Sequence, residues 1–310
     1  MNNVRVEHIS KSYGNVKALQ DISLDILPGE LFGLIGPDGT GKTTLFRIMT
    51  TLLSPDKGDV TVCGYDIKKD LHHIRSIVGY MPGRFSLYQD LTVYENLRFF
   101  ATVFNTTIEE NYETIREIYV QIEPFRNRRA GKLSGGMKQK LALCCALIHR
   151  PEVLFLDEPT TGVDPVSRIE FWDMLARLKE KGITIIVSTP YMDEASRCDR
   201  IALMRDGICL QMGTPEYIRR SFDKPLWAID GENIYKLLTD LRSSDMVYSC
   251  FSFGDTLHLT VKPEITQHKD PETIQKEINV FLEKKGHKQI RMTRIEPGIE
   301  DCFMALQQPV

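Results

Sequence analysis

The sequence predicts an α/β domain followed by a small α+β domain, and three observations lead to this fold class. The chain has 310 residues, which is more than one typical domain of roughly 100–200 residues. Over its first part, apolar strand-like runs precede glycine turns and amphipathic helices. After Arg220 the order becomes βαββαβ, which is typical of a ferredoxin-like sandwich. We therefore expect domains at residues 1–220 and 225–310.

Strands and helices should alternate in the first domain. Leu31–Ile35 is a continuous apolar run, as expected of a strand buried within a sheet. Gly182 is typical of the residue that ends a helix. The expected strands are Val4–Ile9, Ile22–Ile26, Leu31–Ile35, Val60–Cys63, Ile77–Met81, Val153–Leu156 and Ile183–Ser188, and the expected helices are Thr43–Thr51, Lys138–His149 and Val166–Lys181.

A helical block at about residues 85–135 should be inserted into this sheet, with candidate helices at Val93–Phe104 and Ile108–Ile122. The second domain then supplies the βαββαβ order. Its expected strands are Leu226–Ile229, Met246–Phe253, Thr256–Val261 and Gln289–Ile295, and its expected helices are Asn233–Leu241 and Pro271–Lys285. None of its residues carries obvious chemistry, so a structural role is the plainest expectation, with regulation, dimerisation or docking left open.

Composition excludes several classes of protein. The net charge of -3 gives no sign of a nucleic-acid-binding surface. No run approaches the roughly 18 apolar residues of a membrane helix, and the polar start does not resemble a signal peptide. The seven cysteines are scattered without metal-ligand spacing, which predicts reduced and mostly buried thiols. We expect a cytoplasmic chain that can act at a membrane only by docking on other polypeptides.

A phosphate-binding loop follows the strand Leu31–Ile35. Its glycines let backbone N–H groups face phosphates, and the helix that follows adds partial positive charge. Lys42 supplies a full charge, and the Thr43 hydroxyl is the expected Mg²⁺ ligand. A glycine turn that binds nothing would leave the lysine and the threonine without a role. The segment Gly36-Pro37-Asp38-Gly39-Thr40-Gly41-Lys42-Thr43 matches GxxxxGK[ST], and we assign nucleotide binding to Gly36, Pro37, Asp38, Gly39, Thr40, Gly41, Lys42, Thr43 and Thr44.

Two carboxylates end the apolar strand Val153–Leu156. Ligands bind at the carboxyl ends of the strands in doubly wound sheets, so Asp157 and Glu158 should lie beside the phosphate loop. Asp157 would hold the metal through its coordinated water, and Glu158 would act as the general base that polarises the attacking water. The dipeptide alone could be a solvated pair that opens a turn, but the upstream phosphate loop disfavours that interpretation.

A second anion cradle lies at Leu133-Ser134-Gly135-Gly136-Met137, where a serine and two glycines open a helix. Alone, this segment could be a plain helix cap. With both earlier motifs in this order, residues 1–220 resemble the ATP-binding cassette (ABC) ATPases, whose signature is LSGGQ or a close variant. The resemblance implies a P-loop NTPase fold with an antiparallel β subdomain. It also implies a head-to-tail dimer in which ATP is held by the phosphate loop of one chain and by Ser134, Gly135 and Gly136 of the other.

The resemblance assigns two further residues. Tyr13 occupies the position of the aromatic side chain that stacks on adenine, although a tyrosine near a strand could equally be packing. Asp164 lies in a segment similar to the D-loop, which crosses the dimer interface, and a plain turn is the alternative. ATP and Mg²⁺ are the implied cofactors. The implied partners are membrane-spanning permease subunits and a second ABC ATPase chain, which places this chain on the inner face of the plasma membrane.

The sequence departs from the family at two positions. Gly83 stands where the family has a glutamine that touches the metal and the water, and Gln89 lies six residues further on. Pro190 stands where the family has a histidine that contacts the γ-phosphate, and its side chain cannot form a hydrogen bond. Losing one preorganised contact to a transition state lowers a rate by roughly a hundredfold to a thousandfold. We therefore expect intact binding and slow hydrolysis at the chain's own site, with a heterodimer modestly favoured over a homodimer.

The segments Leu91–Leu97 and Met192–Ala195 and the C-terminal extension resemble the drug-export and polysaccharide-export ATPases. In such proteins a coupling helix of the membrane partner docks on the helical insertion, which here carries Phe85, Tyr88, Phe99 and Phe100. Three alternatives stay open: a clamp that binds ATP without hydrolysing it, an ABC ATPase outside transport, and a small-molecule kinase, which the signature disfavours.

Overall fold

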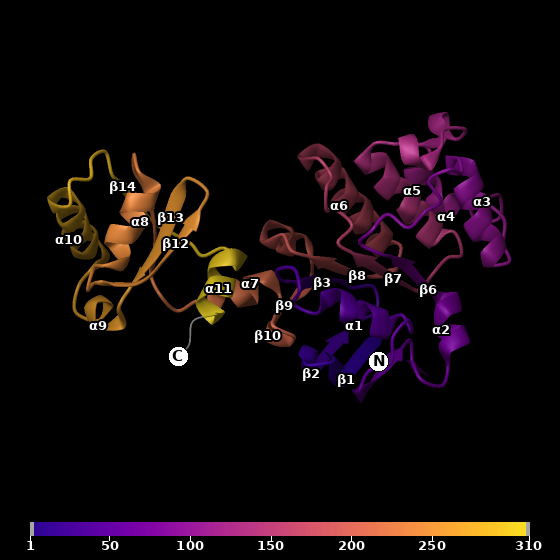
Figure 1. Cartoon of the computed structure of the whole chain (residues 1–310), viewed down its shortest axis with the longest axis horizontal. Helices are drawn as coiled ribbons and strands as arrows, with labels where there is room; N and C mark the ends of the chain where they lie inside the picture. Colours follow the sequence, from indigo (N-terminus) through magenta and orange to yellow (C-terminus); the bar gives the residue numbers. More distant parts are fainter. Residues whose placement is uncertain (1–2, 308–310) are drawn as a thin grey trace. The chain divides into compact units, whose positions relative to one another are not determined.

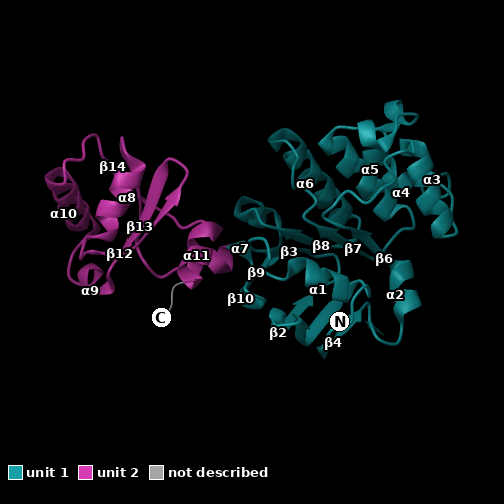
Figure 2. Cartoon of the chain, viewed as in Figure 1, with its two compact units in different colours: residues 1–215 teal, residues 216–310 magenta. Residues whose placement is uncertain are grey.

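The computed structural model describes residues 3–307, and these divide into two compact units at residues 1–215 and 216–310 (Figure 2). The sequence analysis placed the boundary between residues 220 and 225. The short helix α7 (Pro215–Arg220) explains the difference, because the Ile218 carbonyl accepts a hydrogen bond from Cys302 Sγ near the end of the chain, at 3.5 Å. The helix therefore belongs with the C-terminal part.

The first unit contains two sheets. The six-stranded sheet has the order β10-β9-β3-β8-β7-β6, and it is parallel except for the hairpin partner β10. The antiparallel sheet has the order β2-β1-β4-β5. The strands are β1 (Val4–Tyr13), β2 (Val16–Ile26), β3 (Leu31–Ile35), β4 (Lys57–Val62), β5 (Tyr65–Asp66), β6 (Val78–Met81), β7 (Val153–Asp157), β8 (Thr184–Thr189), β9 (Arg200–Arg205) and β10 (Ile208–Gly213).

Helices flank the larger sheet, and α3, α4 and α5 gather beside β6, β7 and β8 (Figure 1). This grouping is the predicted helical insertion together with the helix that follows the signature segment. The α-helices of the first unit are α1 (Lys42–Met49), α2 (Leu71–Ile77), α3 (Val93–Val103), α4 (Tyr112–Tyr119), α5 (Gly135–Leu147) and α6 (Pro165–Glu180), and the 3-10 helices are η1 (Glu123–Phe125), η2 (Ala130–Lys132) and η3 (Met192–Arg197).

Helix α4 begins four residues later than its apolar spacing predicted, because local hydrogen bonds hold the preceding segment as turns. The Glu110 carboxylate accepts from Thr106 Oγ1 at 2.9 Å and from the Thr107 N–H at 3.0 Å. Asn111 Nδ2 donates to the Ile148 carbonyl at 2.7 Å, which ties this turn to the end of α5. Polar side chains that bond to the nearby backbone compete with helix formation in this way.

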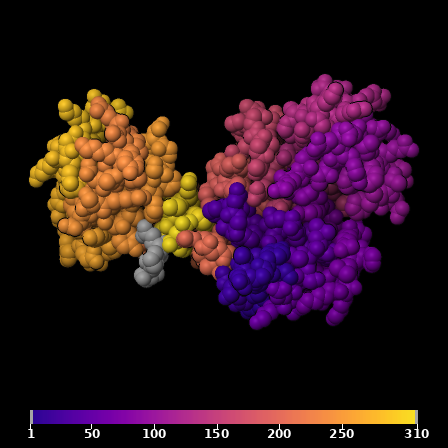
Figure 3. Space-filling model, in the orientation of Figure 1, coloured from indigo at the N-terminus to yellow at the C-terminus, as the bar shows by residue number. Residues whose placement is uncertain are grey.

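The second unit has the predicted ferredoxin-like topology, with a four-stranded antiparallel sheet in the order β12-β13-β11-β14. One face packs against two helices around Trp227, Leu257 and Leu259, and the space-filling view (Figure 3) shows the resulting packed body in orange to yellow. Its elements are β11 (Leu226–Asp230), α8 (Ile234–Arg242), β12 (Val247–Phe253), β13 (Thr256–Val261), α9 (Pro263–Thr266), α10 (Pro271–Lys284), β14 (Arg291–Ile295) and α11 (Ile299–Leu306).

The opposite face of this sheet meets α11. His258 alternates along β13 with the two leucines of the core, so its ring lies on the other face, where Nδ1 is hydrogen-bonded to Asp301 Oδ1 of α11 at 2.7 Å. Among residues 3–307, no helix combines the length and apolar character that crossing a bilayer requires.

Candidate functional site

The loop between β3 and α1 brings its backbone close to neighbouring strands. A Cβ atom at Gly36 would lie 2.2 Å from the Met204 carbonyl oxygen, and one at Gly41 would lie 2.4 Å from the Ala18 carbonyl oxygen. Gly41 also has φ of 97°, which glycine adopts without strain. Helix α1 begins without a side-chain cap, so its first N–H groups are available to an anion.

Lys42 lies buried inside this loop, with 3% of its surface exposed. Its Nζ donates to the carbonyl oxygens of Gly36 at 2.7 Å and Pro37 at 2.9 Å, and it lies 3.5 Å from Glu158 Oε1. Burial lowers the pKa of Lys42, while the Glu158 carboxylate acts in the opposite direction. The ammonium group is therefore fixed where a phosphate would meet the loop, with one carboxylate beside it.

Asp157 and Glu158 occupy the end of β7. The Asp157 carboxylate is buried and accepts a hydrogen bond from Ser188 Oγ at 2.5 Å. The Glu158 N–H donates to the Ser188 carbonyl oxygen at 3.0 Å, so the neighbouring strand β8 holds the Asp157 carboxylate and the backbone of Glu158. Glu158 has φ of 49°, in the left-handed region that non-glycine residues seldom adopt. Such a backbone is a feature of functional sites.

A cavity of about 550 Å³ joins these parts. It brings Tyr13, which is 47% exposed, together with the phosphate loop and Glu158. Asp157 is not among the lining residues and lies buried beside them. The cavity is lined by Tyr13, Val16, Lys17, Ala18, Gln20, Gly39, Gly41, Lys42, Thr43, Thr44, Glu158 and Asp206.

Sequence reasoning missed part of this lining. Val16, Lys17 and Gln20 come from β2, and their closeness to Tyr13 in a predicted strand pair was the available signal. Asp206 comes from the turn between β9 and β10, two strands that the sequence analysis did not predict. Gln20 Nε2 donates to the Asp206 carbonyl oxygen at 2.8 Å, which holds this turn at the cavity.

The signature segment lies outside that cavity. Ser134 caps α5 by accepting from the Met137 N–H at 3.3 Å, and its own side chain is exposed. The neighbouring glycines lie against the D-loop-like segment and α6, because a Cβ atom at Gly135 would lie 3.3 Å from the Gly162 carbonyl oxygen and one at Gly136 would lie 2.7 Å from Ser167 Oγ. Asp164 caps α6 by accepting from the Ser167 N–H at 3.0 Å, a hydrogen bond that lowers its pKa. The signature and Asp164 thus form a second exposed surface of the same unit.

Comparisons with known proteins show the family to which this chain belongs. The sequence profile of a family described as "ABC transporter" matches residues 19–161. A Nod factor export ATP-binding protein I of Rhizobium sp. (strain N33) is 33% identical over 302 residues, which cover 96% of this chain and 94% of the relative. This chain belongs to the ABC transporter ATP-binding family. Members of this family are ATPases, and the matched segment 19–161 includes Lys42 and Glu158.

Other relatives of this ABC protein have different lengths. A probable multidrug ABC transporter ATP-binding protein, YbhF of Escherichia coli (strain K12), is 39% identical over 296 residues. These residues cover 93% of this chain and 49% of YbhF, so the chain spans about half the length of that relative. Among solved structures, the ATP-binding cassette MJ0796, a dimer bound to ADP and Pi, matches with a TM-score of 0.62 and 27% identity over 68% of this chain and 98% of MJ0796.

Gly83 and Pro190, the two positions where the sequence departs from the family pattern, follow strands β6 and β8. A Cβ atom at Gly83 would lie 3.0 Å from the Asp157 carbonyl oxygen and 3.6 Å from Glu158 Cβ, so residue 83 faces both carboxylates without offering a side chain. Gln89 lies elsewhere, because its carbonyl oxygen accepts from the Gly131 N–H at 2.9 Å. Pro190 directly follows the end of β8.

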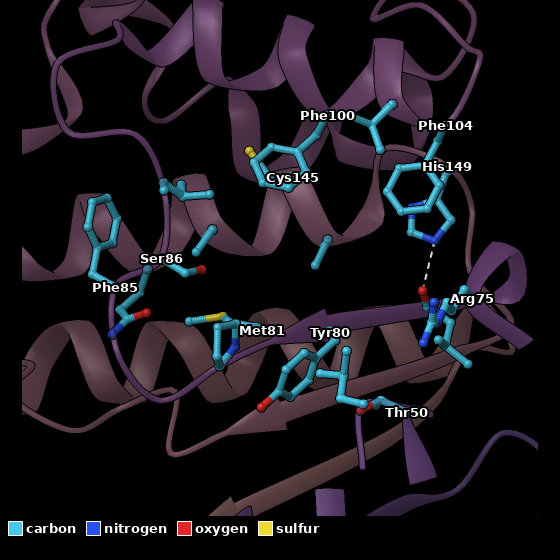
Figure 4. A pocket seen from close by; sticks show the side chains of 18 residues that line it. Thr50, Arg75, Tyr80, Met81, Phe85, Ser86, Phe100, Phe104, Cys145 and His149 are labelled. Carbon is cyan, nitrogen blue, oxygen red and sulfur yellow. Dashed lines mark hydrogen bonds between the residues drawn. The ribbon is translucent and has the colours of Figure 1, made fainter. Parts of the chain in front are cut away.

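A second cavity of about 360 Å³ lies between β6 and the helical insertion (Figure 4). We call it the apolar groove. Phe100 of α3 and Phe104, which directly follows α3, point into it from one side and Met81 of β6 from the other, as Figure 4 shows. The groove is lined by Thr50, Leu52, Arg75, Val78, Tyr80, Met81, Pro82, Phe85, Ser86, Leu87, Phe100, Val103, Phe104, Gln139, Ala142, Cys145, Ala146 and His149.

Of the four aromatic residues noted in the sequence, Phe85 and Phe100 line the apolar groove. Tyr88 and Phe99 lie outside the lining and are 50% and 39% exposed. Their rings pack edge to face with centroids 4.8 Å apart. Two of the four aromatic residues therefore line the groove, and the other two form an exposed aromatic pair outside its lining.

Proposed function

We propose that this ABC ATPase binds MgATP in a head-to-tail dimer and powers a separate membrane-spanning partner. One observation carries the proposal. The phosphate loop and Glu158 share a cavity, whereas the capped helix at Ser134 presents its exposed end outside that cavity. The phosphate loop and the start of the helix at Ser134 can each bind phosphate, but they lie apart on one chain. In a dimer, the phosphate loop of one chain and the Ser134 helix of the other would bind the same nucleotide. The solved MJ0796 dimer supports this arrangement.

Within the site, each residue has a defined task. Lys42 and the first N–H groups of α1 hold the phosphates. Glu158 accepts the proton of the attacking water while the water oxygen bonds to the γ-phosphorus and the bond to the bridging oxygen breaks. Thr43 and Asp157 fit Mg²⁺, because they offer a hydroxyl and a carboxylate oxygen and this ion keeps several waters. The ion would neutralise phosphate charge when bound.

The apolar groove supports the proposal of a membrane partner. An amphipathic helix that enters a groove buries its apolar side chains, and the rings of Phe100 and Phe104 offer the complementary surface. Export is the direction proposed from the relatives, whose printed names are those of multidrug and Nod factor export proteins. On this proposal the chain lies at the inner face of the plasma membrane, without nucleic acid.

The residues at the site further support an asymmetric assembly. Gly83 and Pro190 offer no polar side chain to the chain's own site. Ser134 and Asp164, in contrast, are present and cap their helices with hydrogen bonds. We infer that this chain hydrolyses ATP slowly at its own phosphate loop and completes a fully equipped site on a different ATPase chain. A homodimer in which subfamily variation moved these contacts elsewhere is the second candidate.

Phosphate release by the purified chain, with and without the membrane partner complex that co-purifies with it, tests the proposal. We expect MgATP binding by the chain alone, slow turnover, and a gain when a second ATPase chain is added. Brisk turnover by the chain alone would contradict the asymmetry.

Glu158→Gln then separates slow hydrolysis from a clamp that only binds. Activity of the whole complex should fall if this site turns over and should stay unchanged if it is a clamp. In both cases MgATP binding should persist, because Lys42 and the phosphate loop are untouched.

A further inference from the structure

A buried carboxylate joins two segments of the nucleotide site. Glu194 lies in the short 3-10 helix η3 and is 3% exposed. Its Oε1 accepts from Thr160 Oγ1 at 2.8 Å, and its Oε2 accepts from Thr189 Oγ1 at 2.5 Å. Two residues far apart in the sequence are thus bonded to the two oxygens of one side chain.

The two threonines belong to segments with different tasks. Thr160 follows Glu158 by two residues and begins the stretch that leads to Asp164. Thr189 ends β8 directly before Pro190, and its hydroxyl also accepts from the Tyr191 N–H at 3.1 Å. The Glu194 carboxylate therefore connects the segment that carries the general base with the segment where the family has its histidine.

Arg168 of α6 fixes the carboxylate from a third direction. Its Nε and Nη2 donate to Glu194 Oε1 at 3.1 Å and 3.0 Å, and its guanidinium lies 4.2 Å from the centre of the Tyr191 ring. A carboxylate buried without such donors would be costly, and charge-assisted hydrogen bonds of this kind are among the strong ones. The orientation of Glu194 is therefore determined by four donor atoms.

We propose that Glu194 is a positioning residue that makes the segment 158–164 and the segment 189–195 move as one unit. The proposal rests on the proposed function of this site. Pro190 offers no polar side chain to a nucleotide. The Thr189 carbonyl oxygen accepts from the Gly36 N–H of the phosphate loop at 3.2 Å, and Glu194 adds a side-chain link from this segment to Thr160. A displacement of Glu158 on nucleotide binding would be transmitted through Thr160 and the carboxylate to Thr189. Asp164, on the exposed surface beside the signature, would move with them.

The first experiment replaces Glu194 by glutamine in the full chain. Glu194→Gln removes the charge at constant size, and turnover should fall by up to about a hundredfold at unchanged KM for MgATP, because the general base is misplaced while the phosphate loop is untouched. The rate is measured in the natural chain and in the Gly83→Gln/Pro190→His background. Asp193→Asn is the matched control, because Asp193 is an exposed neighbour whose Oδ2 accepts from the same Arg168 at 3.3 Å. Its turnover should equal that of the unchanged chain.

Hydrogen exchange gives a readout that loss of stability alone would not produce. In the unchanged chain, MgATP should alter amide exchange in segments 158–164 and 189–195 together. In Glu194→Gln, the response of segment 189–195 should be lost while that of the phosphate loop persists. Equal responses of both segments in this variant would overturn the proposal.

A double-mutant cycle guards against a variant that folds poorly. Thr160→Val and Thr189→Val each remove one hydrogen bond at similar volume. Either one breaks the link, so the double variant should lose no more turnover than the more damaging single variant. Multiplicative losses in the double variant would show two independent contacts and would overturn the proposal. If the unchanged chain fails to bind MgATP, the proposed function fails first, which is a distinct result.

Discussion

The two cavities of the first unit differ in chemistry, and one loop lines the apolar groove and faces a carboxylate buried beside the other cavity. The cavity at Lys42, which we call the nucleotide cavity after its proposed function, is lined by residues of the phosphate loop and by Glu158, whereas the apolar groove is lined mainly by apolar side chains. Between them runs the loop after β6, in which Pro82 and Phe85 line the groove and Gly83 faces Asp157. On the proposed function, each cavity binds its own partner, and the loop after β6 is the connection between them and lacks a side chain at Gly83. Binding and coupling can therefore be altered separately in this chain.

The largest expected effect concerns the nucleotide cavity alone. Lys42→Ala should weaken MgATP binding by roughly 2–5 kcal/mol, because it removes a buried charge that faces the phosphates and leaves the neighbouring carboxylate unpaired. Titration calorimetry with MgATP measures the loss. Lys17→Ala is the matched control, since Lys17 is an exposed lysine at the rim of the same cavity. Equal losses in both variants would contradict the assignment.

The connection is tested by restoring the missing side chains. Gly83→Gln combined with Pro190→His should raise turnover of the purified chain by about a hundredfold, because each adds a polar contact to the transition state. The affinity for MgATP should change little. A Cβ at residue 83 lies 3.0 Å from the Asp157 carbonyl oxygen, so Gly83→Ala reports the effect of crowding alone. An unchanged rate in the double variant would show that these positions do not limit hydrolysis.

The apolar groove should respond to substitutions without effect on nucleotide binding. Phe100→Ser should weaken association with the membrane partner by about tenfold or more, as expected for an aromatic anchor in a groove. Co-purification from membranes and surface plasmon resonance measure the change. Tyr94→Ser is the control, because Tyr94 is an exposed aromatic residue of the same helix outside the lining. A comparable loss with Tyr94→Ser would contradict docking in the groove.

The smallest expected effect is a pH dependence of stability at the groove. His149 stacks on Phe104 with ring centroids 3.7 Å apart, its Nε2 lies 3.0 Å from the Val78 carbonyl oxygen, and burial lowers its pKa. Because the folded chain binds this proton less readily than the unfolded chain, His149 should destabilise the fold as the pH falls below its unfolded pKa of about 6.5. His149→Phe should therefore flatten the fall in Tm between about pH 7 and pH 5. Parallel Tm curves for the two chains would refute this assignment.

Sequence patterns located the parts of the candidate site that are formed by residues close together in the sequence. The glycine loop and the apolar strand before Asp157 each carry their signal within a few residues, so their elements were found with near-correct bounds. Asp206 and Glu194 carry no such signal. Asp206 reaches the nucleotide cavity only because β9 and β10 form a hairpin beside β3, and Glu194 is identified only by the long-range hydrogen bonds that it accepts.

In the second unit, too, the sequence predicts the local elements but not the long-range contacts. Its βαββαβ order follows from local periodicity, and the sheet order β12-β13-β11-β14 is the one expected of that arrangement. Helix α11 was not predicted, and its Asp301 reaches His258 on the face away from α8 and α10. Contacts between a chain end and a distant strand depend on tertiary packing, which periodicity does not encode.

The backbone of Glu158 has an implication for engineering. Its φ of 49° is a conformation that disfavours every side chain with a Cβ atom by roughly 1–3 kcal/mol and suits glycine. The chain therefore has a strained backbone at the residue that the proposed function assigns as general base. Selection for heat resistance alone would favour replacing Glu158 by glycine. A thermostable variant of the protein should therefore be screened for turnover as well as for melting temperature.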